Sequence, residues 1–233
     1  MNKFKSNFLD EVGTSVRKIP KNHIHVTGRH AAQKSEGDAD FESMLEAEHL
    51  LLLDHETRVK KYLVQPLRVP VPGVTRGYVP DVLVEFHPDE DGVIAPSELR
   101  EVKSTLDLQI NGAKYVPKFE AARQYCAQRG WSFRIVTELD IRTPRLSNVK
   151  FVRAYEFHQP PQDMVTDVLQ RLTALGLTDS AALLNSLSSD EEEAQLQWVP
   201  VLWHLVAVRK IAVDWDVAFG SVVPLWPMGS CDE

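Results

Sequence analysis

The chain of 233 residues contains only two cysteines, Cys126 and Cys231. Two thiols are too few for a disulfide framework or a cysteine-based zinc cluster. The sequence also lacks any run of about 18 apolar residues, the length that a membrane-spanning helix needs. The segment from Met1 to Phe8 is polar, and it has no apolar stretch of the kind found in signal peptides. These absences predict a soluble, cytoplasmic protein with no membrane partner.

Several common catalytic signatures are missing as well. There is no glycine-rich phosphate loop and no Ser/His/Asp arrangement, and the eight histidines show no convincing metal-binding spacing. What remains is an ordinary globular composition, with 43% hydrophobic and 25% charged residues. The chain is long enough to bury a sizeable core in one large domain or two small ones.

Basic residues are in the minority, since 26 Lys and Arg stand against 33 Asp and Glu for a net charge of -7. This balance argues at first against a nucleic-acid partner. The charge is unevenly spread, however. Residues 81–110 carry -6 and residues 159–233 carry -8, whereas residues 1–40 carry +2 and residues 111–158 carry +5. We therefore expect the basic segments to face DNA and the acidic C-terminal segment to meet a basic protein surface.

Hydrophobic periodicity predicts three regions: a basic N-terminal arm (1–39), an α/β domain (40–158) and an acidic, mostly helical C-terminal module (159–233) that begins after Pro160 and Pro161. In the α/β domain we expect two helices and five strands. The expected helices are Phe41–His55 and Lys114–Gln128, and the expected strands are Val59–Val71, Tyr78–Phe86, Leu99–Ser104, Trp131–Thr137 and Phe151–Tyr155. In the last module we expect helices Met164–Leu175, Ser180–Leu187 and Glu191–Arg209, and a hairpin within Ile211–Leu225.

Two of these strands carry the acidic residues that suggest chemistry. Asp81 follows a proline at the start of one strand, and Glu101-Val102-Lys103 lies twenty positions later within the next. Side chains alternate along a strand, so Glu101 and Lys103 point to the same face. If the strands pair, Asp81 and Glu101 converge, and both carboxylates with the Val102 carbonyl can bind a hard divalent cation. Lys103 would then orient or deprotonate the attacking water in a phosphodiester hydrolysis.

Glu46 adds a further acid. It shares a helical face with Leu50 and Leu53, so it should point inward, where a carboxylate is costly unless it is paired or bound to metal. Gln65 should come near the same region. A less specific interpretation remains open: Glu101 and Lys103 can be a solvated charge pair, and Glu46 can reach water at the edge of the apolar stripe.

The order of these motifs resembles the PD-(D/E)xK nucleases, and within them the TnsA family, the endonuclease subunit of heteromeric transposases. The resemblance covers roughly residues 26 to 158. It rests on the series Ser43-Met44-Leu45-Glu46, Gln65-Pro66, Pro80-Asp81-Val82-Leu83-Val84, Glu101-Val102-Lys103 and the basic helix after Lys114. It implies a restriction-endonuclease-like mixed sheet flanked by helices, followed by a small winged-helix-like module.

The resemblance also implies a mechanism and partners. Glu46, Asp81, Glu101 and Lys103 match the catalytic positions, with Glu46, Asp81, Glu101 and the Val102 carbonyl as ligands of Mg²⁺, for which Mn²⁺ should substitute. One family member has Gln where this chain has Glu101. The protein would cut the 5′ ends of a transposon in double-stranded DNA. A DDE transposase subunit (TnsB-like) would process the other strand, and an AAA+ ATPase regulator (TnsC-like) would couple both to the target.

DNA contacts are expected from basic side chains that neutralise phosphates rather than read bases. The candidates are Arg17, Lys18, Lys21 and Arg29 in the arm, Arg58, Lys60, Lys61, Arg68 and Arg76 around the first strands, and Lys114, Lys118 and Arg123 on the later helix. Two other functions remain open: a stand-alone restriction or repair nuclease, and a catalytically silent factor that bridges DNA-bound proteins.

Overall fold

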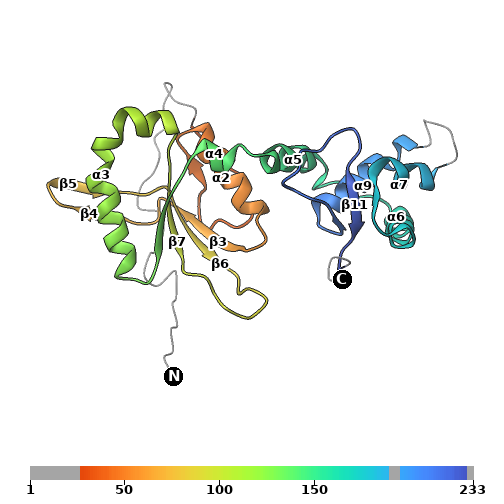
Figure 1. Ribbon diagram of the computed structural model, residues 1–233, viewed down its shortest axis with the longest axis horizontal. Helices are drawn as coiled ribbons and strands as arrows, with labels where there is room; N and C mark the ends of the chain where they lie inside the picture. The colour runs from red at the N-terminus through yellow and green to blue at the C-terminus, as the bar shows by residue number, and fades with distance from the viewer. Residues whose placement is uncertain (1–26, 189–194, 230–233) are drawn as a thin grey trace. The chain divides into compact units, whose positions relative to one another are not determined.

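The computed structural model describes residues 27–188 and 195–229. Its chain forms two compact units that divide between Ile141 and Arg142 (Figure 1). The division falls earlier than residue 158, where we predicted the α/β domain to end. Each unit is described separately below, because each has a hydrophobic core of its own.

The first unit is built on a four-stranded mixed sheet in the order β3-β6-β7-β8. Strand β6 (Val82–Phe86) pairs antiparallel with both β3 (Val59–Val64) and β7 (Glu98–Val102), and β8 (Ser132–Val136) pairs parallel with β7. Helix α2 (Met44–His55) covers one face, and helix α3 (Thr105–Ala127) covers the other (Figure 1). The predicted mixed α/β sheet is thereby confirmed.

The strand pleat separates two cores. Leu63, Leu83 and Leu99 are fully buried on the α3 face, where they pack with Phe119 and Cys126. Their chain neighbours point the opposite way, so Val64, Val82 and Val84 pack under Leu50 and Leu53 of α2. Because both faces are covered, the strands are apolar almost continuously rather than in simple alternation.

Two predicted strands, Val59–Val71 and Tyr78–Phe86, are each divided between two observed strands, so their predicted boundaries are wrong. The expected strand Val59–Val71 ends as β3 at Val64, because Gln65 adopts a left-handed backbone with φ 47° and Pro66 follows. The chain then forms a separate antiparallel ribbon of β4 (Val69–Val71) and β5 (Val74–Tyr78). Gly77 is required in this ribbon, because a Cβ atom there would lie 2.6 Å from the carbonyl oxygen of Val69.

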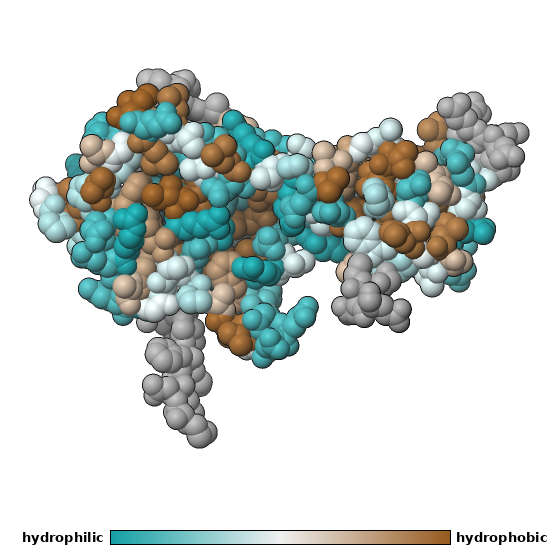
Figure 2. Space-filling view, viewed as in Figure 1, coloured by the Kyte–Doolittle hydropathy of each residue, from teal (hydrophilic) through white to brown (hydrophobic). Residues whose placement is uncertain are grey.

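Helix α3 begins at Thr105, nine positions before the predicted start at Lys114. Ser104 caps it by accepting a hydrogen bond from the Asp107 N–H at 3.1 Å. The first turns show no buried stripe, since Leu106 and Ile110 are 63% and 70% exposed, and apolar surface is visible over this end of the helix (Figure 2). The missing stripe hid these turns from a periodicity argument.

The last part of the predicted N-terminal arm (1–39) is ordered: residues 28–41 fold back onto the rest of the first unit. Strand β1 (Gly28–Arg29) pairs with β2 (Asp40–Phe41), and Asp54 of α2 holds the segment between them. The Asp54 carboxylate lies 2.7 Å from Nε2 of His30 and accepts hydrogen bonds from the N–H groups of Gln33 and Lys34. One buried carboxylate therefore organises this return of the chain.

Helices and a small sheet make up the second unit. The helices are α5 (Pro144–Val152), a 3₁₀ turn (Arg153–Tyr155), α6 (Gln162–Leu175), α7 (Ser180–Leu187) and α9 (Val199–Ala207). The short strand predicted at Phe151–Tyr155 is wrong. Leu146, Val149 and Val152 are buried at three-residue intervals, which is the spacing of a helix. Helix α4 (Glu138–Ile141) precedes the division, in the first unit.

The end of the chain forms the three-stranded sheet β10-β11-β9, of β9 (Thr178–Asp179), β10 (Ile211–Ala212) and β11 (Pro224–Pro227). Strands β10 and β11 are antiparallel, as expected of the predicted hairpin. Within the predicted helix Glu191–Arg209, residues 191–194 lie outside the described residues, residues 195–196 are helical, and after a turn at 197–198 the chain continues as α9, which ends at Ala207. In the described part of the chain, no helix has the length and apolarity to cross a bilayer.

Candidate active site

The proposed acidic residues meet at one end of the sheet in the first unit. Leu63, Leu83 and Leu99 stand opposite one another across β3, β6 and β7. One row nearer the same end of the sheet stand Gln65, Asp81 and Glu101, each two positions in the sequence from its leucine. Side chains repeat every second residue along a strand, so Asp81 and Glu101 lie on the same face as these leucines. The Gln65 N–H donates to the Asp81 carbonyl at 2.7 Å, so Gln65 reaches this region as predicted.

Asp81, Glu101 and Lys103 form a connected polar cluster. Lys103 Nζ lies 2.8 Å from Oε1 of Glu101 and 3.9 Å from Oδ2 of Asp81. Oδ2 of Asp81 also accepts a hydrogen bond from the Val102 N–H at 2.7 Å, and the Val102 carbonyl accepts one from Lys103 Nζ at 3.1 Å. The four predicted groups of the Pro-Asp and Glu-x-Lys motifs are therefore brought together.

Tyr78 is a further member of this cluster that no sequence pattern singled out. Its hydroxyl donates a 2.6 Å hydrogen bond to Oε2 of Glu101, whose side chain is only 5% exposed. Tyr78 lies at the end of β5, on a ribbon outside the main sheet, so the contact depends on the fold of that ribbon. Burial and the neighbouring Glu101 both raise the pKa of Tyr78, which keeps its hydroxyl a donor.

The cluster has excess negative charge only when both of its carboxylates are ionised. Burial, followed by repulsion from Glu101, raises the pKa of Asp81 to about 8. Burial works against the charged form of Lys103, but the carboxylates of Asp81 and Glu101 outweigh it and raise the lysine pKa above its ordinary value. Lys103 is therefore a firmly held ammonium group. One lysine does not offset two buried carboxylates, so the site has an affinity for further positive charge.

Glu46 lies near this cluster but is engaged elsewhere. Its carboxylate accepts hydrogen bonds from the Glu42 N–H at 2.8 Å and from the Ser43 hydroxyl at 3.0 Å, while Ser43 caps α2 through the Glu46 N–H. This is a variant of the helix capping box. Burial, and then the charge of Asp81, raise the pKa of Glu46 to about 7. Glu46 thus faces the same site electrostatically while it stabilises the start of its helix.

The donor set fits a hard divalent cation. Carboxylate oxygens of Asp81 and Glu101 and the Val102 carbonyl are the ligand type that Mg²⁺ and Mn²⁺ prefer, and their net charge calls for a cation. The side chains do not by themselves form a complete metal cage. Within residues 27–188 and 195–229, no group of three or more His, Cys, Asp and Glu side chains is placed to hold one metal ion.

The predicted DNA-binding residues differ in what surrounds them. Arg17, Lys18 and Lys21 lie outside the described residues. Three of them form ion pairs within the chain: Arg29 with Asp38 and Asp40, Lys60 with Glu85, and Lys61 with Glu36 and Glu85. Acidic side chains therefore largely neutralise these positive charges. Arg68 donates to the Arg76 carbonyl, and Arg58 lies over the Phe86 ring. Arg123 pairs with Glu120 on the surface of α3.

Lys118 is a predicted DNA contact that lies beside the aromatic rings of the acidic cluster. Its Nζ is 6.0 Å from the ring centre of Tyr78 and 5.7 Å from that of Tyr115, and Lys103 Nζ is 6.0 Å from the same Tyr115 ring. Lys114 lies one turn earlier on α3 and contacts Asn111. Two lysines and an aromatic ring therefore border the cluster on the α3 side, where a phosphate backbone would be attracted.

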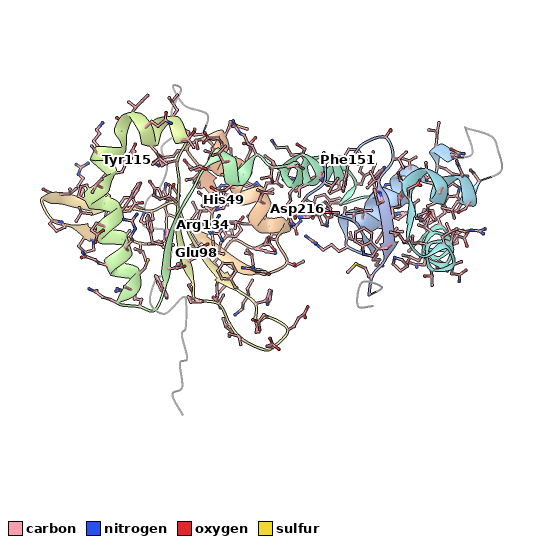
Figure 3. All side chains as sticks on the ribbon, in the orientation of Figure 1. His49, Glu98, Tyr115, Arg134, Phe151 and Asp216 are labelled. Atoms are coloured by element: carbon pink, nitrogen blue, oxygen red, sulfur yellow. The ribbon has the colours of Figure 1, made fainter. Side chains whose placement is uncertain are left out.

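A histidine that the sequence did not single out is buried on the other face of the sheet. His49 of α2 lies near Arg134 and Glu98 (Figure 3) and is 4% exposed. Burial, and then the charges of Arg100 and Arg134, lower its pKa to about 3, so the ring is neutral at physiological pH. Glu98 is bonded to Arg100 at 2.6 Å, and Arg134 to Asp140 at 2.8 Å.

Comparison with protein families matched two family models to the chain. The model described as "TnsA-like endonuclease N terminal" matches residues 56–138, and the model described as "TnsA endonuclease C terminal" matches residues 140–215. This chain belongs to the TnsA endonuclease family. The junction of the two matches lies beside Ile141, where the two structural units divide. A search of curated proteins found no match.

The N-terminal family match covers most of the cluster at the sheet end. It includes Asp81, Glu101 and Lys103, whereas Glu46 lies before it. Two carboxylates and a lysine are groups that can serve metal-assisted phosphodiester hydrolysis. Family membership thus confirms the predicted resemblance and implies a role in cleavage at transposon ends.

Proposed function

We propose that this protein is a divalent-metal-dependent DNA endonuclease that cleaves the 5′ ends of a transposon within a heteromeric transposase. The observation that supports it is the contact of Lys103 with the carboxylates of Glu101 and Asp81, at 2.8 Å and 3.9 Å, at the end of the sheet. The motif alone is common. Its groups converge here on one buried position in a chain of the TnsA family.

Each group has a role in this proposal. Asp81, Glu101 and the Val102 carbonyl would hold Mg²⁺ or Mn²⁺, with Glu46 as a further acidic ligand. Such a cation would supply Lewis-acid chemistry toward the scissile phosphate and the attacking water. Lys103, whose raised pKa keeps it protonated, orients that water and the phosphate by donating hydrogen bonds. Tyr78 fixes the orientation of Glu101.

The substrate and partners follow from charge. Lys114 and Lys118 border the acidic cluster on α3 and would hold the DNA backbone by contacts that do not depend on sequence. Residues 159–233 carry a net -8, which disfavours DNA and favours a basic protein surface. We assign that acidic part to contacts with a DDE transposase subunit and an AAA+ ATPase regulator, which would deliver the nuclease to its cleavage site.

A cleavage assay with paired variants tests the proposal. Asp81→Asn and Lys103→Ala should each abolish cutting of transposon-end DNA in the presence of Mg²⁺ and the transposase subunits, because one loses a ligand charge and the other the ammonium donor. Both variants should keep the circular dichroism spectrum of the wild type. Glu90→Ala, an exposed change between β6 and β7, is the control and should cut normally.

Two outcomes would contradict the proposal in different ways. Full cleavage by a well-folded Asp81→Asn or Lys103→Ala variant would remove the assigned site. Robust, sequence-specific cutting by the purified chain with no transposase subunits would instead favour a stand-alone nuclease. Wild-type protein that binds its partners but cuts nothing under any metal condition would favour a silent assembly factor.

A further inference from the structure

Gln65 is a buried residue with an unexplained polar atom. Gln65 is only 5% exposed, and its side-chain oxygen Oε1 has no hydrogen-bond partner. An amide oxygen withdrawn from water without a partner destabilises the folded state. An uncompensated polar group of this kind in a native protein calls for an explanation such as a ligand or ion.

The backbone of Gln65 is strained as well. Its φ of 47° places a non-glycine residue in the left-handed region, between the end of β3 and Pro66. Such conformations persist where the surrounding structure fixes them, and they concentrate at functional sites. Two unfavourable features therefore coincide at one residue.

The position of Gln65 explains both features. In the row across the sheet, Gln65 lies next to Asp81, as Asp81 lies next to Glu101, and its N–H bonds the Asp81 carbonyl at 2.7 Å. The polar cluster satisfies Glu101 through Tyr78 and Lys103, and Asp81 through the Val102 N–H. Within the described residues it offers no donor to the Gln65 oxygen.

We propose that the Gln65 side-chain carbonyl is a further oxygen donor to the divalent cation held by Asp81 and Glu101. An amide oxygen is a ligand of the same hard class as a carboxylate, and it adds no negative charge to a site that already has an excess. This role extends the proposed function and rests on it. Gln65 would thereby complete a donor set drawn from the residue after β3, the residue before β6 and the strand β7.

A calorimetric titration of the full chain with Mn²⁺, in the absence of DNA, tests this role separately from catalysis. Gln65→Met keeps an unbranched side chain of similar length but removes the oxygen, so it should bind Mn²⁺ at least tenfold more weakly. Its unfolding midpoint without metal should equal or exceed that of the wild type, because the unpaired oxygen is gone. Gln65→Glu keeps an oxygen donor and should retain Mn²⁺ binding.

Two further variants keep the result interpretable. Gln65→Asn suits a left-handed backbone and withdraws the oxygen by one bond, so it should fold and also bind Mn²⁺ more weakly, even if the methionine variant does not fold. Trp198→Phe removes another buried unpartnered atom, the indole Nε1 in the second unit, and should leave the Mn²⁺ affinity unchanged.

The outcomes separate this inference from the function on which it rests. Wild-type Mn²⁺ affinity in folded Gln65→Met and Gln65→Asn, with binding lost in Asp81→Asn, would overturn the role of Gln65 and leave the proposed metal site standing. Absence of Mn²⁺ binding in the wild type, or unchanged binding in Asp81→Asn, would overturn both.

Discussion

The hydroxyl of Tyr78 donates a 2.6 Å hydrogen bond to one carboxylate oxygen of Glu101, and Lys103 lies 2.8 Å from the other. Glu101 is thus held from two sides in a single orientation. Removing a group that orients a metal-binding carboxylate typically lowers metal affinity or activity by about 10- to 100-fold. Tyr78 therefore links the β4–β5 ribbon to the site at the end of the sheet.

Replacing Tyr78 with phenylalanine should reduce cleavage by about 10- to 100-fold, because Glu101 loses the donor that orients it. The free energy of unfolding should fall by about 1–3 kcal/mol, since a buried carboxylate oxygen is left unpaired. Tyr115→Phe is the matched control: its hydroxyl bonds Asp107 at 2.9 Å on the surface of α3. Equal cleavage rates in the two variants would show that the Tyr78 contact is not functional.

Mn²⁺ affinity should depend on pH through Asp81. Because burial and Glu101 raise its pKa to about 8, the metal must displace a proton below that pH. Affinity should rise by up to about tenfold for each pH unit between 6 and 8 and level off above 8. Calorimetry in two buffers of different ionisation enthalpy measures both the affinity and the released proton. An affinity independent of pH over this range would rule out the assignment.

The raised pKa of Asp81 also predicts how the stability of the metal-free protein depends on pH. The folded chain holds a proton on Asp81 that the unfolded chain releases above pH 4, so this residue makes the protein less stable as the pH rises from about 4 toward 8. Asp81→Asn should remove that contribution. Urea unfolding of both proteins in EDTA gives the difference, which should grow in favour of the variant up to pH 8.

His49 should make the folded protein less stable as the pH falls, whereas Asp81 makes it less stable as the pH rises. Its pKa is about 3 when folded against an ordinary value of 6.5, so its stabilising contribution is complete above pH 6.5 and is lost as the pH falls toward 3. Between pH 7.5 and pH 5.0 this loss amounts to about 2 kcal/mol. His49→Leu should be less sensitive to acid by that amount in urea unfolding. Identical losses in wild type and variant would contradict the buried, neutral state of the ring.

Asn148 should be essential to the second unit. Its Nδ2 donates to the carbonyls of Trp215 and Val217 at 3.0 and 2.8 Å, and its Oδ1 accepts from the Phe219 N–H at 2.9 Å. Asn148→Ala leaves three backbone groups without this partner in a site that is 2% exposed. The free energy of unfolding should fall by about 2–4 kcal/mol.

The neighbouring ion pair gives the control for Asn148. Arg145 bonds Asp216 at 2.7 Å, but the Asp216 side chain is 67% exposed, so Arg145→Ala should cost less than about 1 kcal/mol. Tryptophan fluorescence follows both variants, because four of the five tryptophans lie in residues 142–233. Equal destabilisation by the two changes would show that the buried asparagine is not the stronger tie.

Local sequence patterns predicted most helices and the central strands, but not where the strands break. Apolar runs identify β3, β6 and β7 because both faces of the sheet are covered. The break at Gln65 depends on a left-handed backbone that is uncommon for glutamine, and the early start of α3 depends on a cap with exposed leucine and isoleucine after it. Helical periodicity was misread at Phe151–Tyr155, because three buried residues are too few to distinguish the two periods.

By itself, the sequence determined the acidic motifs, the family and the faces on which Glu101 and Lys103 stand, since alternation along one strand is a local property. Only the tertiary structure decided what else surrounds them. Strand pairing placed Asp81 beside Glu101, the separate ribbon brought in Tyr78, and the end of β3 left the Gln65 oxygen buried without a partner. These contacts join residues that are remote in the chain, so no local pattern of hydrophobicity or charge encodes them.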